Sequence, residues 1–122
     1  MKRALLIVLA LAACTPSNPE KWMEREINAC LPTAIAFRQG LKRQDVWAEV
    51  FSYRYRDAIE NKLHGHAMTA YLYPPGANKL WTYDNAGSWR VRAYTNDVVS
   101  IAREANSVRG FGTNTFMAEW IK

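Results

Sequence analysis

Apolar residues recur with a helical period in the segment that follows residue 20. From Leu31 onward they take the i, i+3, i+4 and i+7 spacing that places side chains on one side of a helix. We therefore predict mainly helix over residues 20–44, with a second piece that starts near Pro32 and breaks near Gly40. Proline fits the first turn of a helix and glycine its end. On this prediction Cys30 lies at or just before a helix N-terminus.

The rest of the chain favours short strands that alternate with turn residues. Strands are predicted over residues 46–54, 66–73, 80–84 and 89–94, separated in part by strong turn signals at 74–78 and 85–88. A helix is predicted over 98–105, capped by residues 95–97, and a last strand or short helix within 107–122. The order predicts an α+β domain, in which an N-terminal helix carrying the cysteine packs on a small antiparallel sheet.

The first strand has two apolar faces. Trp47, Phe51 and Tyr53 alternate onto one of them, and the other face carries Val46, Ala48 and Val50.

The N-terminus reads as a targeting segment and not as part of the fold. Lys2 and Arg3 precede an apolar run over residues 4–13, which is shorter than the ~20 residues of a membrane span and fits a signal peptide. The run ends in Leu-Ala-Ala-Cys at 11–14, which resembles the lipobox of bacterial lipoproteins. That resemblance implies cleavage before Cys14 and a lipid on Cys14 that anchors the chain to a membrane of the bacterial cell envelope. The alternative is an ordinary cleaved signal peptide with a coincidental cysteine.

This reading divides the chain into three parts. They are a signal peptide over 1–13, a lipidated, proline-rich tether over 14–19, and a single domain over 20–122. Thr15, rather than aspartate, follows the cysteine, and in a Gram-negative bacterium this favours the periplasmic face of the outer membrane.

Composition and charge narrow the class of protein. The 122 residues, 49% hydrophobic and 12% aromatic, suit one packed domain. The formal charge of +5 falls by two, to +3, without Lys2 and Arg3. Lysine and arginine form no run, so we expect no nucleic-acid partner, and the charge suits anionic lipid, cell wall or simply solubility. No glycine-rich phosphate loop is present, and we expect no cofactor and no metal.

The two cysteines pose a question about Cys30. With Cys14 lipidated, Cys30 has no partner within the chain. Export places proteins where disulfides form, so an unpaired thiol there is buried, paired between chains or reactive. A buried, inert structural thiol is the plain alternative to a reactive one.

Three residues match the needs of a cysteine nucleophile. A helix N-terminus and a nearby imidazolium favour the thiolate, which points to Cys30 and to His66 at the predicted start of a strand. The histidine needs a group that orients its ring, and Asp84 ends the neighbouring strand. Gly65 leaves room for a close approach beside His66.

The same stretches resemble the papain-like and transglutaminase-like cysteine enzymes. The resemblance rests on NACLPTA at 28–34, GHAM at 65–68, LWTYDN at 80–85 and GSW at 87–89, with Cys, His and Asp in the family order. It implies that Cys30 is the nucleophile, His66 the general acid and base, and Asp84 its orienter. The implied reaction is cleavage or exchange of an amide in a protein, peptide or peptidoglycan substrate, through a thioester.

The chain departs from the family where the oxyanion is bound. Papain-like enzymes often carry a glutamine about six residues before the cysteine, and Glu24 stands there. The expected donors are therefore the backbone N–H of Cys30 and the side chain of Asn28.

Two other interpretations use the same residues or the aromatic strands. His64 and His66 face the same way on a strand and, with Cys30 and Asp84, would make a zinc set. Alternatively, the domain keeps the fold without catalysis and binds a partner through one aromatic face. The aromatic residues of the predicted sheet either pack in the core, which is the first interpretation, or form a platform for a glycan or peptide. They are Tyr71, Tyr73, Trp81, Tyr83, Trp89 and Tyr94.

Overall fold

The computed structural model describes residues 18–122, which form two helices and a five-stranded antiparallel sheet. The expected α+β class is confirmed. The elements are α2 (Pro19–Lys42), β1 (Ala48–Arg56), β2 (Leu63–Leu72), β3 (Leu80–Asp84), β4 (Gly87–Val91), α3 (Val98–Val108) and β5 (Thr115–Ile121). The predicted signal peptide, Cys14 and all but the last two residues of the tether lie outside the described residues. Neither helix in the described part is long and apolar enough to span a bilayer.

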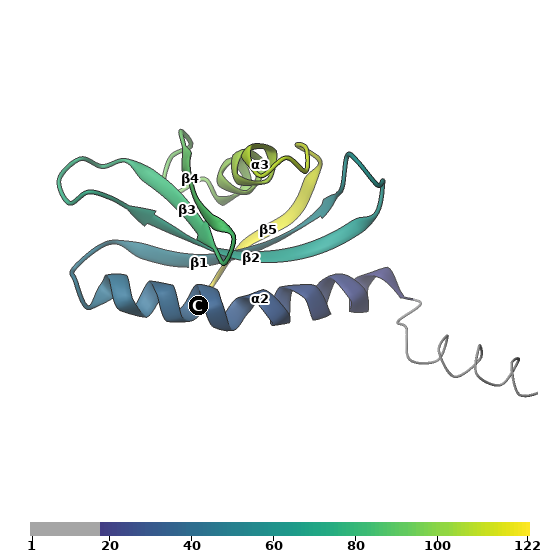
Figure 1. Cartoon of the computed structure of the whole chain (residues 1–122), viewed down its shortest axis with the longest axis horizontal. Helices are drawn as coiled ribbons and strands as arrows, with labels where there is room; N and C mark the ends of the chain where they lie inside the picture. The colour runs from purple at the N-terminus through teal and green to yellow at the C-terminus, as the bar shows by residue number, and fades with distance from the viewer. Residues whose placement is uncertain (1–17) are drawn as a thin grey trace, which may run out of the picture.

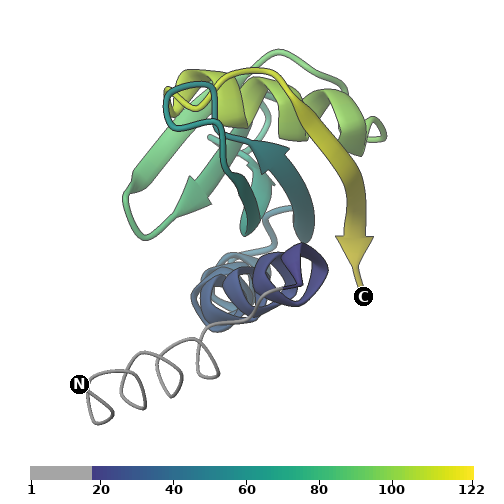
Figure 2. The ribbon, with the colours of Figure 1, turned by 90° about the vertical axis from the view of Figure 1, so that its right-hand side faces the viewer.

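The sheet lies between the two helices. Its strand order is β4-β3-β2-β1-β5, so that β1 to β4 form the predicted meander and β5 returns after α3 to the free side of β1. Figure 1 shows α2 beneath the sheet and α3 above it, and Figure 2 shows the same layers from one end. The C-terminal tail is therefore a strand, as one of the two predicted options has it.

The first strand is packed on both faces. Phe51 and Tyr53 are fully buried in the core under α3, with Trp47 packed against that core. Val46 and Ala48 are buried with Leu41 on the α2 side. Burial on both sides explains why apolar residues occur on both faces of this strand.

The prediction of two helical pieces separated at Pro32 is wrong. The helix α2 starts at Pro19, where Asn18 caps it by accepting a bond from the Glu20 N–H at 2.9 Å, and continues for 24 residues through Pro32 and Gly40. An interior proline removes the bond to the carbonyl four residues earlier and costs roughly 3 kcal/mol. Here that carbonyl belongs to Asn28, and both Asn28 and Pro32 are exposed to water.

Burial of one side of α2 against the sheet offsets this cost. Met23, Ile27, Ala34 and Leu41 are buried at helical spacing along most of its length. The central part of the helix is also tied to the sheet by the Thr69 hydroxyl, which donates to the Ala34 carbonyl at 2.7 Å. Packing that spans the whole helix therefore outweighs the local preference for a break.

Gly65 allows α2 and β2 to approach at backbone distance. A Cβ atom at this position would lie 2.1 Å from the Met23 carbonyl oxygen and 2.8 Å from Cγ1 of Ile27. Both neighbours belong to the helix, and the oxygen is part of its backbone. The room that the sequence led us to expect beside His66 is thus filled by α2.

Gly65→Ala is expected to lower the free energy of unfolding by about 1–3 kcal/mol or more, because the helix backbone must move away. Urea denaturation of the variant measures this loss. Gly40→Ala is the matched control, since the nearest atom to its added Cβ is 3.9 Å away, and it should stabilise the helix by roughly 0.5–1 kcal/mol. Equal effects of the two substitutions would contradict the packing argument.

Candidate functional site

The structure brings Cys30, His66 and Asp84 together. The Cys30 Sγ atom lies 3.3 Å from Nδ1 of His66, and the His66 Nε2 atom lies 2.7 Å from Oδ2 of Asp84. A carboxylate only accepts, so Nε2 carries the proton and a neutral ring leaves Nδ1 free to accept from the thiol. The three residues thus form a continuous hydrogen-bonded relay, although Cys30 and His66 are 36 positions apart in the sequence and His66 and Asp84 are 18 apart.

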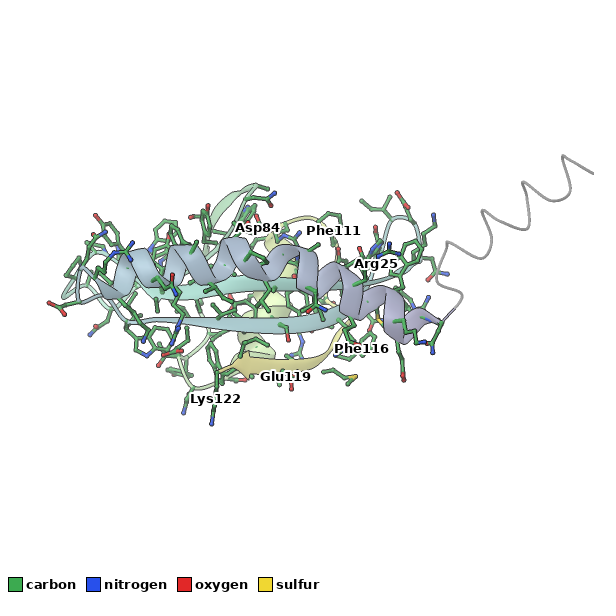
Figure 3. All side chains as sticks on the ribbon, turned by 90° about the horizontal axis from the view of Figure 1, so that it is seen from below. Arg25, Asp84, Phe111, Phe116, Glu119 and Lys122 are labelled. Carbon is green, nitrogen blue, oxygen red and sulfur yellow. The ribbon has the colours of Figure 1, made fainter. Side chains whose placement is uncertain are left out.

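The relay crosses the open edge of β2. His66 shares its strand face with Met68 and Ala70, which pack toward α3, whereas Cys30 comes from α2 on the opposite face. The strand β3 pairs with β2 only from Thr69 to Leu72, so in the described structure the first half of β2 has no β3 neighbour. The thiol and the imidazole meet at this gap. Figure 3, seen from the α2 side, places Asp84 beside the middle of α2.

Two sequence predictions about location are wrong. Cys30 does not open a helix, because it is the twelfth residue of the continuous α2 and gains nothing from a helix N-terminus. His66 does not open its strand either, because β2 begins at Leu63, which pairs with Arg56 of β1. Asp84 does end β3, as predicted.

The continuous helix also removes both expected oxyanion donors. Asn28 lies two residues before Cys30, about 200° around the helix axis, and its side chain is exposed. The Cys30 N–H is in the helix interior, where it donates to the carbonyl of Glu26. The position of Glu24 is likewise an exposed one on α2.

Asp84 is buried and has a second cationic partner, Arg109. The Nε atom of Arg109, at the C-cap of α3, lies 3.1 Å from Oδ2 of Asp84, with side chains only 11% and 5% exposed. The Ala86 N–H donates to Oδ1 of Asp84 at 2.8 Å. Both carboxylate oxygens are therefore bonded. Although burial opposes ionisation, the bonds from His66 and Ala86 and the charge of Arg109 lower the pKa of Asp84.

Arg109 is itself held by a buried network. Its Nη1 atom donates to the Tyr53 hydroxyl at 3.0 Å, and its guanidinium lies over the Phe111 ring, 4.8 Å from the centroid. The Tyr53 hydroxyl donates to Asn106 at 3.0 Å, and Asn106 donates to the Gly112 carbonyl at 2.9 Å. The sequence does not predict the role of Arg109, because a lone arginine before a glycine carries no signal of its own.

The thiol and the imidazole rest in their neutral forms. Burial raises the pKa of Cys30, and the carboxylates of Asp84 and Glu26 raise it further, against the Ala67 N–H and Arg109. Burial lowers the pKa of His66, with help from Arg109, although the bond to Asp84 opposes this shift. The thiolate that a helix N-terminus would have favoured is thus not the resting form.

The lowered pKa of His66 predicts a loss of stability on mild acidification. The unfolded state takes up the histidine proton near its ordinary pKa of ~6.5, above the pKa in the folded state, so folding is opposed as the pH falls through that range. A one-proton difference gives a slope of at most about 1.4 kcal/mol per pH unit. Urea denaturation between about pH 5 and pH 8 measures it, and His66→Gln should flatten the curve there. An unchanged slope in that variant would contradict the prediction.

The relay opens into a small cavity. This cavity of about 230 Å³ is lined largely by short side chains: Ala29, Cys30, Thr33, Ala34, Ala67, Asp84 and Asn85. The thiol is therefore partly accessible and is a free cysteine. It meets an acid–base partner on one side and open space on another, which is what a nucleophile requires.

The zinc interpretation is not supported by the geometry. His64 turns to Glu26, with its Nδ1 atom 2.9 Å from a carboxylate oxygen, and does not join the relay. Over residues 18–122, no three histidine, cysteine or acidic side chains are grouped so that they could hold a metal ion.

Core packing, the first of the two interpretations of the aromatic residues, is confirmed for four of the six, which pack on the two sides of the sheet. Tyr71 is buried on the α2 side with Trp81 and Tyr83 packed there, whereas Trp89 packs against the core under α3. Only Tyr73 and Tyr94 are largely exposed, at 48% and 80%. The platform interpretation is thus left with these two exposed residues.

A comparison of the chain with protein-family models, curated proteins and solved structures finds no match.

Proposed function

We propose that the chain is a cysteine hydrolase or acyltransferase that acts on an amide bond through Cys30, His66 and Asp84. The observation that carries the proposal is the relay of 3.3 Å and 2.7 Å that ends at a thiol beside a cavity. A helix that carries the cysteine, and neighbouring strands that carry the histidine and aspartate, support a small variant of the papain-like and transglutaminase-like arrangement. Metal and cofactor have no role in this proposal.

The residues act in a defined sequence. As Sγ of Cys30 attacks the amide carbon, its proton moves to Nδ1 of His66 and the carbonyl oxygen becomes an oxyanion. The intermediate collapses when the C–N bond breaks and His66 gives the proton to the leaving amine. Water or an acceptor amine then loses a proton to His66 and attacks the thioester, which restores the thiol.

The neutral resting pair makes general-base activation the route to the thiolate. The thiol proton leaves only as the sulfur attacks, and Asp84 stabilises the imidazolium that forms at that moment. Arg109 limits that stabilisation by sharing Oδ2 of Asp84. A neutral thiol also alkylates slowly, which protects an unpaired cysteine in an oxidising compartment.

The short side chains around the thiol favour a small acyl group. Ala29, Ala34 and Ala67 provide methyl groups where a bulky residue would fill the cavity. We therefore expect acyl groups with a small side chain, in a protein, peptide or peptidoglycan substrate, to react faster than branched ones.

Acyl transfer from 4-nitrophenyl acetate tests the proposal without knowledge of the substrate. The full chain with Cys14→Ser keeps Cys30 as its sole thiol. It should release a burst of 4-nitrophenolate and carry one acetyl group on Cys30 by mass spectrometry, and 4-nitrophenyl pivalate should react more slowly. Cys30→Ala should abolish the burst. Absence of the acetyl adduct, or an undiminished burst in Cys30→Ala, would overturn the proposal.

We also propose that a lipid on Cys14 holds this domain in the bacterial cell envelope, with the periplasmic face of the outer membrane favoured in a Gram-negative bacterium. The support is the lipobox-like sequence before Cys14, which leaves a short tether before α2 starts at Pro19. Labelling of cells with radioactive palmitate should mark the protein, and Cys14→Ser should remove the label. A label that persists in this variant contradicts lipidation at Cys14.

A further inference from the structure

The reaction requires a hydrogen-bond donor for the oxyanion that forms when Cys30 attacks. Such donors lie 2.7–3.1 Å from the developing charge and are usually backbone N–H groups or amide side chains. The N–H of a nucleophile at the start of a helix is free to serve, but that of Cys30 is used inside α2. The donor must therefore come from another element that borders the cavity.

The strand β2 offers an N–H group that no neighbouring strand of the described structure uses. The Leu72 N–H bonds to Trp47 on the β1 side, and the next N–H, of Tyr73, bonds to Lys79 on the β3 side. Because this direction alternates along a strand, the N–H of Ala67 points away from β1. β3 pairs with β2 only over Thr69–Leu72, so among the described strands none pairs with Ala67 on that side.

The Ala67 N–H also faces the reacting sulfur. It lies near enough to Cys30 to lower the pKa of the thiol, although burial raises that pKa overall. Ala67 lines the same cavity as Cys30, directly after His66 in the strand. An oxygen on the carbon bonded to Sγ would thus lie close to a donor that the resting enzyme directs at the sulfur itself.

We propose that the backbone N–H of Ala67, at the open edge of β2, is an oxyanion donor of this site. The inference rests on the proposed function. It assigns oxyanion binding to the edge of β2, because the Cys30 N–H is used inside α2. The neighbouring His66 is then fixed on the same strand as the donor, so one rigid element positions both the base and the oxyanion site.

An aldehyde adduct tests the donor directly. N-acetyl-alaninal should add to Cys30 of the full chain carrying Cys14→Ser, forming an Sγ–C bond while the thiol proton passes to His66 and the aldehyde oxygen gains negative charge. The amide proton of Ala67 should then move downfield and exchange more slowly in NMR spectra, and that of Gly65 should not. An adduct that forms by mass spectrometry without a change at Ala67 overturns the inference. No adduct at all overturns the proposed function, and the inference with it.

Backbone substitution measures the contribution to rate. Lactic acid in place of Ala67, introduced into the full chain, replaces the N–H by an ester oxygen and should slow acylation by 4-nitrophenyl acetate about 10²–10³-fold. Glycolic acid in place of Gly65 is the matched control. It replaces a backbone N–H of the same strand by an ester oxygen two residues away, and it should leave the acylation rate essentially unchanged. Equal rates for the two variants, both folded by circular dichroism, would overturn the assignment.

Discussion

His66→Ala is expected to slow the acylation of Cys30 by about 10³-fold. The thiol is neutral at rest because burial raises its pKa, so the reaction requires a base within reach of its proton. Nδ1 of His66, at 3.3 Å, is that base. Its removal leaves only the small fraction of thiol that ionises into water.

The burst of 4-nitrophenolate measures this effect, with His64→Ala as the matched control. His64 belongs to the same strand, two residues earlier, but pairs with Glu26 instead of the thiol. We expect His64→Ala to retain most of the acylation rate. If His66→Ala reacts as fast as the unchanged chain at neutral pH, the thiol needs no base and the relay has no catalytic role.

Arg109→Met is expected to lower the free energy of unfolding by about 3–5 kcal/mol, which is the usual cost of removing one partner from a buried ion pair. The substitution leaves the Asp84 carboxylate 5% exposed with only neutral donors, from His66 and Ala86, and it takes a donor from the Tyr53 hydroxyl. Because small domains have a total free energy of unfolding of only ~5–15 kcal/mol, the expected loss is a large fraction of the total stability.

Urea denaturation with Arg103→Met as the control separates this effect from a general loss of charge. Arg103 belongs to the same helix and is exposed, so its replacement should change stability by no more than about 0.5 kcal/mol. Arg109→Lys keeps the positive charge but lacks the planar guanidinium that bonds to Asp84 and Tyr53 at once. Its loss of unfolding free energy should lie between those of Arg109→Met and Arg103→Met. Similar stabilities of Arg109→Met and Arg103→Met would contradict the network.

The loss in Arg109→Met should depend on pH in a defined direction. Arg109 lowers the pKa of His66, so its removal raises that pKa and allows a charged imidazole to neutralise Asp84. The destabilisation should therefore be smaller near pH 5.5 than near pH 8. The only two histidines of the chain are His64 and His66, which makes the imidazole titration resolvable by NMR.

Local elements of this protein follow from local sequence. The alternation of Trp47, Phe51 and Tyr53 against Val46, Ala48 and Val50 predicts a strand, and the structure has β1 there. The cap at Asp97, the strand Leu80–Asp84 and the turn after Tyr73 are found as predicted. These features depend on side chains only a few residues apart, so they can be predicted from the sequence without knowledge of the tertiary structure.

The identity of the candidate triad was also available from sequence, but its setting was not. An unpaired Cys30, a histidine beside Gly65 and an aspartate at a strand end were enough to predict that the three meet. Which part of a helix holds the thiol was predicted wrongly, since Pro32 indicates a helix start when only its neighbours are considered.

What the sequence by itself determined is therefore the α+β class, most strands and the three residues of the relay. Tertiary structure alone decided that α2 continues through Pro32, since burial of its side along the whole sheet outweighs the local cost of the proline. It also decided that β3 leaves the edge of β2 open, that Arg109 reaches Asp84 from the end of α3, and that the aromatic residues are divided between two faces. Each of these depends on contacts between segments distant in the chain, whose energies no short stretch of sequence encodes.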